Sequence, residues 1–403
     1  MKITCVTCPG LVLGLLIIGS IFIGTVSGID SPGVPSKLMG YWDVRTVDTP
    51  APPGVITSLD FDLSGRPHLG YASQVNLFDY TMRYAYKDRF GWHTENIDTS
   101  MTAIPYPVLK VAPGGKPSVL YGYIIDVNGP VLGLKLATKE PSGWNIEVLE
   151  DTSPLPYQNE TGGFYSLAFD QLGRPHITYQ DNEFHLFYAW KDSSGWHREQ
   201  VDTVTTGDQN LQLNLQGRPS IVYTQFTDDL SSHLVKYAWK DSSGWHIDVI
   251  DQGNLGPAGF DSDGQGKPHV VYAIINDMGG PDELVYAWKD GGVWHKETVI
   301  ATGKYGGQVP VVVDPFNIVH FAYFIQDPLY FNTISLNHAY RDRGVWQFEM
   351  VATKDMVRGL NDGCSLAFSR LKGWGISFTS GEFGATEIRY AERSTMLRPP
   401  PLP

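Results

Sequence analysis

Cysteine is scarce in this chain of 403 residues, which contains only three. Cys5 and Cys8 precede an apolar run near the N-terminus, so removal of that segment would leave Cys364 alone. We therefore predict no internal disulfide and a fold held together by packing. A metal or redox site at Cys5 and Cys8 is not expected.

Long hydrophobic runs are also lacking, apart from one at residues 11–26, which follows Lys2 and precedes Ser27 and Gly28. A positive residue before a short apolar run, and small residues after it, are typical of a secretory signal. We predict that residues 1–28 form a signal peptide cleaved near Gly28. The alternative is an uncleaved membrane anchor, because the run is just shorter than the roughly 17–25 residues that span a bilayer. In both cases the remaining chain should be extracytoplasmic, either secreted or at the cell surface.

Positively charged residues are fewer than negatively charged ones, and the formal net charge is -13 at pH 7. An acidic surface argues against nucleic acid and anionic membranes as partners. Contact with a membrane is expected only if residues 1–28 remain attached. We expect the protein to be a monomer.

Catalytic and metal-binding signatures are missing as well. The chain has no GxSxG elbow, HExxH pair, P-loop, GxGxxG fingerprint or Cys/His metal spacing. Asp261-Ser262-Asp263-Gly264 begins like a calcium loop, but Tyr272 stands where such a loop needs glutamate. We therefore predict no cofactor, no metal and no catalytic residue.

A repeated segment is the main feature that is present. FYAWKDSSGWHREQV, ending at Val201, returns as KYAWKDSSGWHIDVI, VYAWKDGGVWHKETV and RYAYKDRFGWHTENI, with looser copies ending at Val148 and Met350. The Trp near the middle of the segment recurs at intervals of 52, 52, 49, 49 and 52 residues, at positions 92, 144, 196, 245, 294 and 346. A period of about 50 residues is typical of a β-propeller blade.

Each unit has the pattern of four short strands. In the third copy, alternating residues at 166–169 precede the turn Asp170 to Pro175 (DQLGRP), and further strands follow at 176–179, 186–190 and 196–201. Four alternating segments joined by tight turns predict one antiparallel sheet.

The two ends of the chain give the number of blades. The last copy, from Ser365 to Arg393, lacks the strand that carries Trp, whereas residues 41–48 (YWDVRTVD) are an isolated strand of that type. We therefore predict an all-β, seven-bladed β-propeller over residues 29–395, in which the N-terminal strand completes the last blade and closes the ring. Residues 396–403 are rich in proline and are expected to form a tail.

Residues that recur once per unit should serve packing and turns. These are the Trp series, the Tyr series 71, 121, 179, 223, 272 and 323, and His68, His176, His269 and His320. Asp62, Asp170, Asn214, Asp263 and Asp314 share one turn position and should cap their own turns.

Function is expected where the repeat varies. The turns between first and second strands and between third and fourth strands are uniform, and the loops at the opposite face vary, so we place any binding site on that variable face near the central channel. Aromatic rings there can stack on sugars, and carboxylates can accept hydrogen bonds from hydroxyl groups. The candidate ligand-binding residues are Tyr106, Tyr157, Tyr165, Asp181, His185, Asp228, His233, Tyr305 and Arg358.

The unit GRPHITY…LFYAWKDSSGWHREQVD resembles the repeats of secreted bacterial and archaeal β-propellers grouped with sialidase-type (BNR, Asp-box-like) proteins. It is also similar in layout to seven-bladed lectins and propeller polysaccharide lyases. The resemblance implies the fold over nearly all of residues 41–395 and leaves the activity open. Sialidase residues do not transfer, because KDSSGW departs from the Asp-box pattern and Arg66, Arg174 and Arg218 occupy a repeated turn.

These observations favour an extracytoplasmic binding module, whose ligand is a glycan or an extracellular protein, over an enzyme. One alternative is a carbohydrate-active enzyme, either a polysaccharide lyase or a sialidase-like glycoside hydrolase. The lyase alternative would draw on His185, His233, Tyr157 or Tyr165. Another alternative is a cell-surface adhesion or scaffold protein.

Overall fold

The computed structural model describes residues 41–51, 56–75, 80–100, 104, 106–126, 131–149, 165–181, 184–203, 207–227, 232–278, 280–326, 334–353, 363–382 and 385–394. All regular structure in these ranges is β-strand. The predicted signal peptide, the C-terminal tail and three candidate residues, Tyr157, Asp228 and Arg358, lie outside the described residues.

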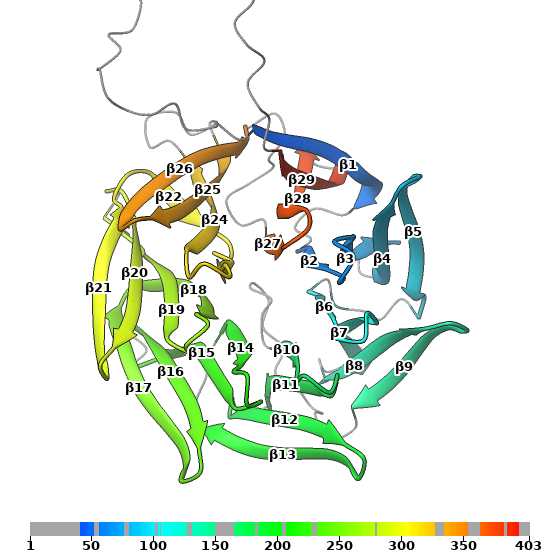
Figure 1. Cartoon of the computed structure of the whole chain (residues 1–403), viewed down its shortest axis with the longest axis horizontal. Helices are drawn as coiled ribbons and strands as arrows, with labels where there is room; N and C mark the ends of the chain where they lie inside the picture. Colours follow the sequence, from blue (N-terminus) through cyan, green and yellow to red (C-terminus); the bar gives the residue numbers. More distant parts are fainter. Residues whose placement is uncertain are drawn as a thin grey trace, which may run out of the picture. The chain divides into compact units, whose positions relative to one another are not determined.

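The strands form seven antiparallel sheets arranged as the blades of a β-propeller, which confirms the predicted fold (Figure 1). Blade 1 contains β2 (Ser58–Phe61), β3 (Pro67–Gln74), β4 (Tyr80–Asp88) and β5 (Gly91–Asp98). Blade 2 contains β6 (Val108–Val111), β7 (Pro117–Asp126), β8 (Val131–Glu140) and β9 (Gly143–Leu149). Blade 3 contains β10 (Tyr165–Phe169), β11 (Pro175–Gln180), β12 (Leu186–Asp192) and β13 (Gly195–Asp202).

Blades 4 to 6 continue the series around the ring. Blade 4 contains β14 (Gln209–Leu213), β15 (Pro219–Phe226), β16 (His233–Asp241) and β17 (Gly244–Gly253). Blade 5 contains β18 (Leu255–Ser262), β19 (Pro268–Ile274), β20 (Glu283–Asp290) and β21 (Val293–Ile300). In blade 6 the inner strand is split into β22 (Lys304–Gly306) and β23 (Val311–Val313), which both pair with β24 (Val319–Gln326), followed by β25 (Ile334–Asp342) and β26 (Val345–Ala352).

Blade 7 joins the two ends of the chain. It contains β27 (Cys364–Ser369), β28 (Gly373–Glu382) and β29 (Ala385–Ser394), and its outer strand is β1 (Tyr41–Ala51). β1 runs antiparallel to β29, with Tyr41 opposite Ser394 and Arg45 opposite Tyr390. The predicted closure of the ring by the N-terminal strand is therefore confirmed, and Figure 1 shows β1 beside β29.

The repeated first turn is held by its own acidic residue, as predicted. Asp170 Oδ1 accepts the N–H groups of Leu172 at 3.0 Å and Arg174 at 2.9 Å. Gly173 has a φ of 75°, in the left-handed region that glycine enters without a steric cost. In blade 6 Asn317 takes this position with a φ of 61°, which asparagine tolerates better than most residues. Turn geometry thus accounts for the repeated sequence without a bound metal.

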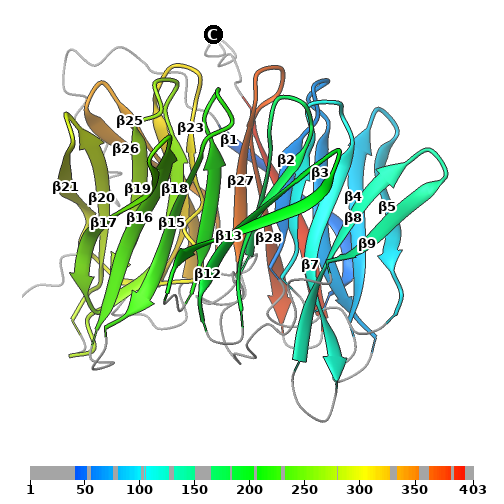
Figure 2. The ribbon, with the colours of Figure 1, turned by 90° about the horizontal axis from the view of Figure 1, so that it is seen from below.

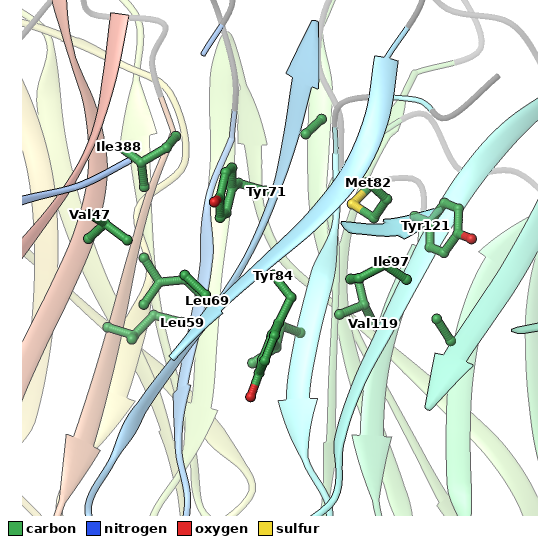
Figure 3. Close-up of a cluster of buried hydrophobic side chains, with 14 of the residues drawn as sticks. Val47, Leu59, Leu69, Tyr71, Met82, Tyr84, Ile97, Val119, Tyr121 and Ile388 are labelled. Atoms are coloured by element: carbon green, nitrogen blue, oxygen red, sulfur yellow. The ribbon is translucent and has the colours of Figure 1, made fainter. Parts of the chain in front are cut away.

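The core lies between adjacent blades. Figure 3 shows one cluster in which Leu69, Tyr71 and Tyr84 of blade 1 pack between Ile388 of blade 7 and Val119 of blade 2. The predicted packing role of the Tyr series is confirmed, since all six are buried. Several of them also donate a hydrogen bond to the aspartate that ends the outer strand of the preceding blade, as Tyr121 does to Asp98 at 2.8 Å.

Ion pairs connect the blades along their outer parts. In the described chain a cation on the third strand of each blade reaches an acid on the preceding blade: Lys87 to Glu392, Lys139 to Glu95, Lys191 to Glu147, Lys240 to Glu199, Lys289 to Asp248, Arg341 to Glu297 and Arg393 to Glu349. The repeated Trp often shares this acid, as Trp196 Nε1 does by donating to Glu147 at 3.1 Å. Partly exposed pairs each stabilise by about 0–1 kcal/mol, so they mainly fix how the blades are oriented.

Candidate binding site at the channel mouth

The inner strands of all seven blades surround a central cavity of about 170 Å³. An inner strand has one edge without a partner strand, so its buried N–H groups need other acceptors. Polar side chains of the preceding blade supply them. Asp60 Oδ2 accepts the Val111 N–H at 2.8 Å, and Asp261 Oδ2 accepts the Val313 N–H at 2.7 Å. Much of the polar channel wall is therefore structural.

The mouth of the channel on the variable face departs from the repeat. One residue of each inner strand is a buried apolar side chain in every blade: Leu59, Leu109, Leu167, Leu211, Phe260, Val311 and Leu366. The residues that lie two and three positions before it differ from blade to blade and include Tyr106, Tyr165, Asp208, Gln209 and Gln308. These five side chains are among those that line the cavity. The mouth is thus the part of the channel that the repeat does not dictate.

Asp208 is the only described carboxyl group in the cavity lining, and it is 7% exposed. Burial raises its pKa to about 7, and a hydrogen bond from Gln308 Nε2 to Asp208 Oδ1, at 3.4 Å, offsets only part of that effect. Asp208 therefore changes charge near neutral pH, whereas an ordinary aspartate is ionised there.

Gln209 follows Asp208 and is 4% exposed, and within the described ranges neither its amide nitrogen nor its amide oxygen has a hydrogen-bond partner. Gln180 at the end of β11 is fully buried and equally unpaired. In the repeat, Gln180 is the blade 3 counterpart of Gly122 and Gln209 is the blade 4 counterpart of Tyr165. At the junction of blades 2 and 3, Gly122 and Tyr165 are in contact, because the Tyr165 hydroxyl accepts the Gly122 N–H at 2.9 Å. Buried amides without partners are costly, so the junction of blades 3 and 4 is suited to bind water or a polar ligand.

Two candidate tyrosines occupy different environments from those expected. Tyr165 lies in β10 and not in a loop, is 4% exposed, and donates a hydrogen bond to the Tyr106 carbonyl oxygen at 2.6 Å. Tyr305 lies in β22, is 6% exposed, and donates to the Thr302 carbonyl oxygen at 2.6 Å. The expectation that both lie in variable loops is corrected, because they belong to inner strands and their rings fill space between blades. Tyr106 is half-buried and lines the cavity with Tyr165.

The remaining described candidates lie apart from the cavity lining. Asp181 and His185 close a tight loop together, with 3.0 Å between Asp181 Oδ2 and His185 Nδ1. His233 begins β16 and packs on Phe226 with ring centroids 4.3 Å apart, and burial lowers its pKa. Neither His185 nor His233 lines the cavity beside Tyr165. Their role in binding stays a prediction.

Sequence reasoning missed Asp208, Gln209 and Gln308. None of them carries an aromatic ring or belongs to the repeat, so nothing marked them in the linear sequence. Alignment of the inner strands on their repeated apolar residue would have shown three polar residues at one level of the channel.

Two further properties concern the described ranges only. No group of three or more His, Cys, Asp or Glu side chains in these ranges is arranged to hold a metal ion. No helix long and apolar enough to cross a membrane is found in the part of the chain that the structure describes.

Comparison with known proteins supports the fold. No family model matches the chain, and no curated protein is significantly similar to it in sequence. Among solved structures, an ulvan lyase described as a new family of polysaccharide lyase superposes with a TM-score of 0.54 at 12% identity, over 85% of this chain and 95% of that one. A protein of unknown function from Dyadobacter fermentans gives a TM-score of 0.51 at 11% identity, over 87% and 99% of the two chains. The phage phi92 endosialidase gives 0.51 at 9% identity, over 90% and 70%. The β-propeller that the sequence resemblance implied is thus shared with these proteins.

Proposed function

We propose that this protein is a binding module that holds a hydroxylated group of a glycan at the mouth of its central channel. The observation that carries the proposal is the departure from the repeat at Asp208, Gln209 and Gln308, where the buried Gln209 amide has no hydrogen-bond partner among the described residues. Amide and carboxyl groups together can accept from and donate to sugar hydroxyls. Two of the solved structures with this fold are a polysaccharide lyase and an endosialidase, which is consistent with a glycan ligand.

The dimensions of the cavity limit what it can hold. Its volume of about 170 Å³ is below the roughly 300–1,000 Å³ typical of small-molecule pockets. We therefore expect one small hydroxylated group, such as part of a terminal sugar, to enter the mouth. A longer chain would continue over the variable face.

Binding is favoured over hydrolysis because of the acid content of the site. A glycosidase needs two carboxyl groups about 5–9.5 Å apart. The described lining of the cavity holds one, Asp208. We also infer from the N-terminal apolar run that the protein acts outside the cytoplasm.

The test is binding of the purified protein to a broad glycan array, followed by mass spectrometry of the bound sugar. An intact sugar is expected. Gln209→Leu should weaken binding at least about tenfold without lowering the melting temperature, since it removes a buried amide that has no partner. Gln216→Leu, an exposed glutamine in a turn of the opposite face, is the matched control and should leave binding unchanged. Cleaved sugar would support the enzyme alternative, and unaltered binding by Gln209→Leu would exclude the channel mouth.

A further inference from the structure

Two cavities lie on the uniform-turn face, opposite the channel mouth. One, of about 360 Å³, lies between blades 3 and 4 and is lined by Trp190, Arg218 and Lys240 among others. The other, of about 500 Å³, lies between blades 7 and 1 and is lined by Arg66, Lys87 and Lys372 among others. We call them the 3/4 pocket and the 7/1 pocket. Figure 2 shows turns of this face, such as the one joining β8 to β9, along the upper edge of the ring.

The two pockets are built from equivalent parts of the repeat. Gly217-Arg218-Pro219 in the 3/4 pocket corresponds to Gly65-Arg66-Pro67 in the 7/1 pocket, and Lys240-Asp241 corresponds to Lys87-Asp88. The repeat therefore supplies the same type of site at two junctions. We infer that both pockets bind the carboxylate or sulfate groups of an acidic glycan.

Charged side chains line the 3/4 pocket. They are Arg174, Arg218 and Lys240 and one acid, Asp241. Arg174 is paired with Asp170 and Lys240 with Glu199, so the cation that remains for a ligand is Arg218. Asp241 is already engaged, since its Oδ1 lies 3.0 Å from His246 Nε2 and accepts the Ser243 N–H at 2.7 Å. An arginine whose charge is not offset, on a chain of net charge -13, favours an anionic ligand.

The 7/1 pocket has a similar lining, in which Arg66 is paired with Asp62 and Lys87 with Glu392. Its cations are Arg66, Lys87, Arg89 and Lys372, and its acids are Asp88 and Glu392. Phe90 beside them is 77% exposed and carries Arg89 over its ring at 4.6 Å. Exposed aromatic surface next to cations suits a sugar ring that bears an anionic group.

A substitution within the repeat frees one cation in the 3/4 pocket. In blade 3, Asp170 Oδ2 binds Arg174 Nε at 2.6 Å and its Oδ1 caps the turn. In blade 4 the neutral Asn214 still caps the turn, accepting the Arg218 N–H at 2.9 Å, but it offers no negative charge. No ion pair or side-chain hydrogen bond of the Arg218 guanidinium is found in the described chain.

Blade 7 repeats this arrangement with different residues. Ser369 stands at the turn-capping position and accepts the N–H groups of Leu371 and Lys372 at 3.2 and 3.3 Å. The ammonium group of Lys372 has no ion pair within the described ranges. Each pocket therefore has one cation that the fold leaves available for an anion.

Other junctions show how the same space can be closed. Lys116 pairs with Glu140 and Lys267 pairs with Asp290, both at 2.7 Å, so the turn cations of blades 2 and 5 are neutralised. At the junction of blades 6 and 7, Trp374 stacks on His320 with ring centroids 3.8 Å apart. Arg218 and Lys372 thus differ from the turn cations Lys116 and Lys267, which are paired within their own blades.

The pockets lie three junctions apart in one direction around the ring and four in the other, on the same face. A polyanion with regularly spaced charges can therefore contact both pockets. Once one pocket is occupied, binding at the other is intramolecular, which raises the overall affinity. We expect binding that is stronger for long chains than for short ones and that weakens with added salt.

Two acidic polymers serve as probes, polygalacturonate for carboxylate and dextran sulfate for sulfate, with neutral dextran as the control. The affinity of the purified protein is measured by calorimetry at low and at physiological salt. At least one polyanion should bind, and neutral dextran should not. The double variant Arg218→Gln with Lys372→Gln should weaken binding roughly tenfold or more, the loss expected for charge-assisted hydrogen bonds.

Lys267→Gln is the matched variant, because it removes an equivalent turn cation that is already paired with Asp290. It should change the affinity by less than about twofold, as expected for a partly exposed pair. If Lys267→Gln lowered the affinity as much as the double variant, the attraction would be unspecific. If the protein bound neither polygalacturonate nor dextran sulfate, the inference would be overturned. Gln209→Leu should leave polyanion binding unchanged, so failure of this inference and failure of the proposed channel site remain distinguishable.

Discussion

At the scale of single residues, burial and not residue type decides what a polar side chain does in this protein. Asp208 and Asp170 are both nearly inaccessible. The Asp170 carboxylate accepts hydrogen bonds from backbone N–H groups and pairs with Arg174. These interactions lower its pKa, although burial by itself would raise it. Asp208 receives one long hydrogen bond, and burial raises its pKa. Asp170 therefore stabilises a turn. Burial of the Asp208 carboxyl group costs stability, which points to a functional role for this residue.

Asp208→Asn should stabilise the protein in a pH-dependent manner. The folded pKa of about 7 lies above the unfolded value of about 3.9. Between these two values the unfolded chain releases the proton that the folded chain retains, so stability falls as pH rises through this window. Above pH 7 the wild-type protein has lost on the order of 4 kcal/mol of its free energy of unfolding in this way, and Asp208→Asn does not lose it.

The measurement is the melting temperature of both proteins at pH 4.5 and pH 8. The difference should be small at the lower pH and large at the higher one. Gln209→Leu carries no titratable group and should show a shift that does not depend on pH. Equal shifts of Asp208→Asn at both pH values would show that the Asp208 carboxyl group is not held protonated by the fold.

At the scale of strands and blades, the repeated Lys, Trp and Glu form a contact between neighbours. Glu147 accepts both Lys191 Nζ at 2.7 Å and Trp196 Nε1 at 3.1 Å. At the next junction Glu199 binds Lys240, whereas Trp245 Nε1 has no hydrogen-bond partner in the described part of the chain. The contact of Lys, Trp and Glu at the junction of blades 2 and 3 thus has one hydrogen bond more than its counterpart between blades 3 and 4.

Glu147→Ala should therefore cost more stability than Glu199→Ala. The first removes an ion pair and a Trp hydrogen bond, for about 1–2 kcal/mol. The second removes only an ion pair, for about 0–1 kcal/mol. Urea denaturation of the two variants provides the comparison, and equal costs would show that the Trp hydrogen bond contributes nothing.

At the scale of the whole molecule, the ring depends on one strand. β1 pairs with β29 and brings Val44 and Val47 into two hydrophobic clusters. Asp48 of this strand also accepts the Tyr71 hydroxyl at 2.6 Å, so β1 links blade 7 to blade 1. Without it, β29 would become an exposed edge strand.

Deletion of residues 41–51 should abolish the cooperative melting of the full chain. Calorimetry is expected to show a broad or early transition, because the junction between blades 7 and 1 loses both pairing and packing. Tyr41→Ser is the control, since this side chain is 47% exposed and should leave the transition in place. A deleted protein that melts like the intact one would refute closure by β1.

The sequence by itself determined the architecture. Strand alternation, tight turns and a period of about 50 residues are local signals, and they were enough to predict seven blades, the closing strand and the buried Tyr series. The repeated Asp at the first turn acts within five residues, so its capping role was equally predictable.

Only the tertiary structure decided which residues share a site. The channel mouth joins Asp208 to Gln308, which lies 100 positions further along the chain, and the 3/4 pocket joins side chains of two blades. Tyr165 and Tyr305 were expected in loops because their flanking sequence varies, but inter-blade packing buries them. Closure of the ring sets these distances and this burial, and local sequence patterns carry no record of either.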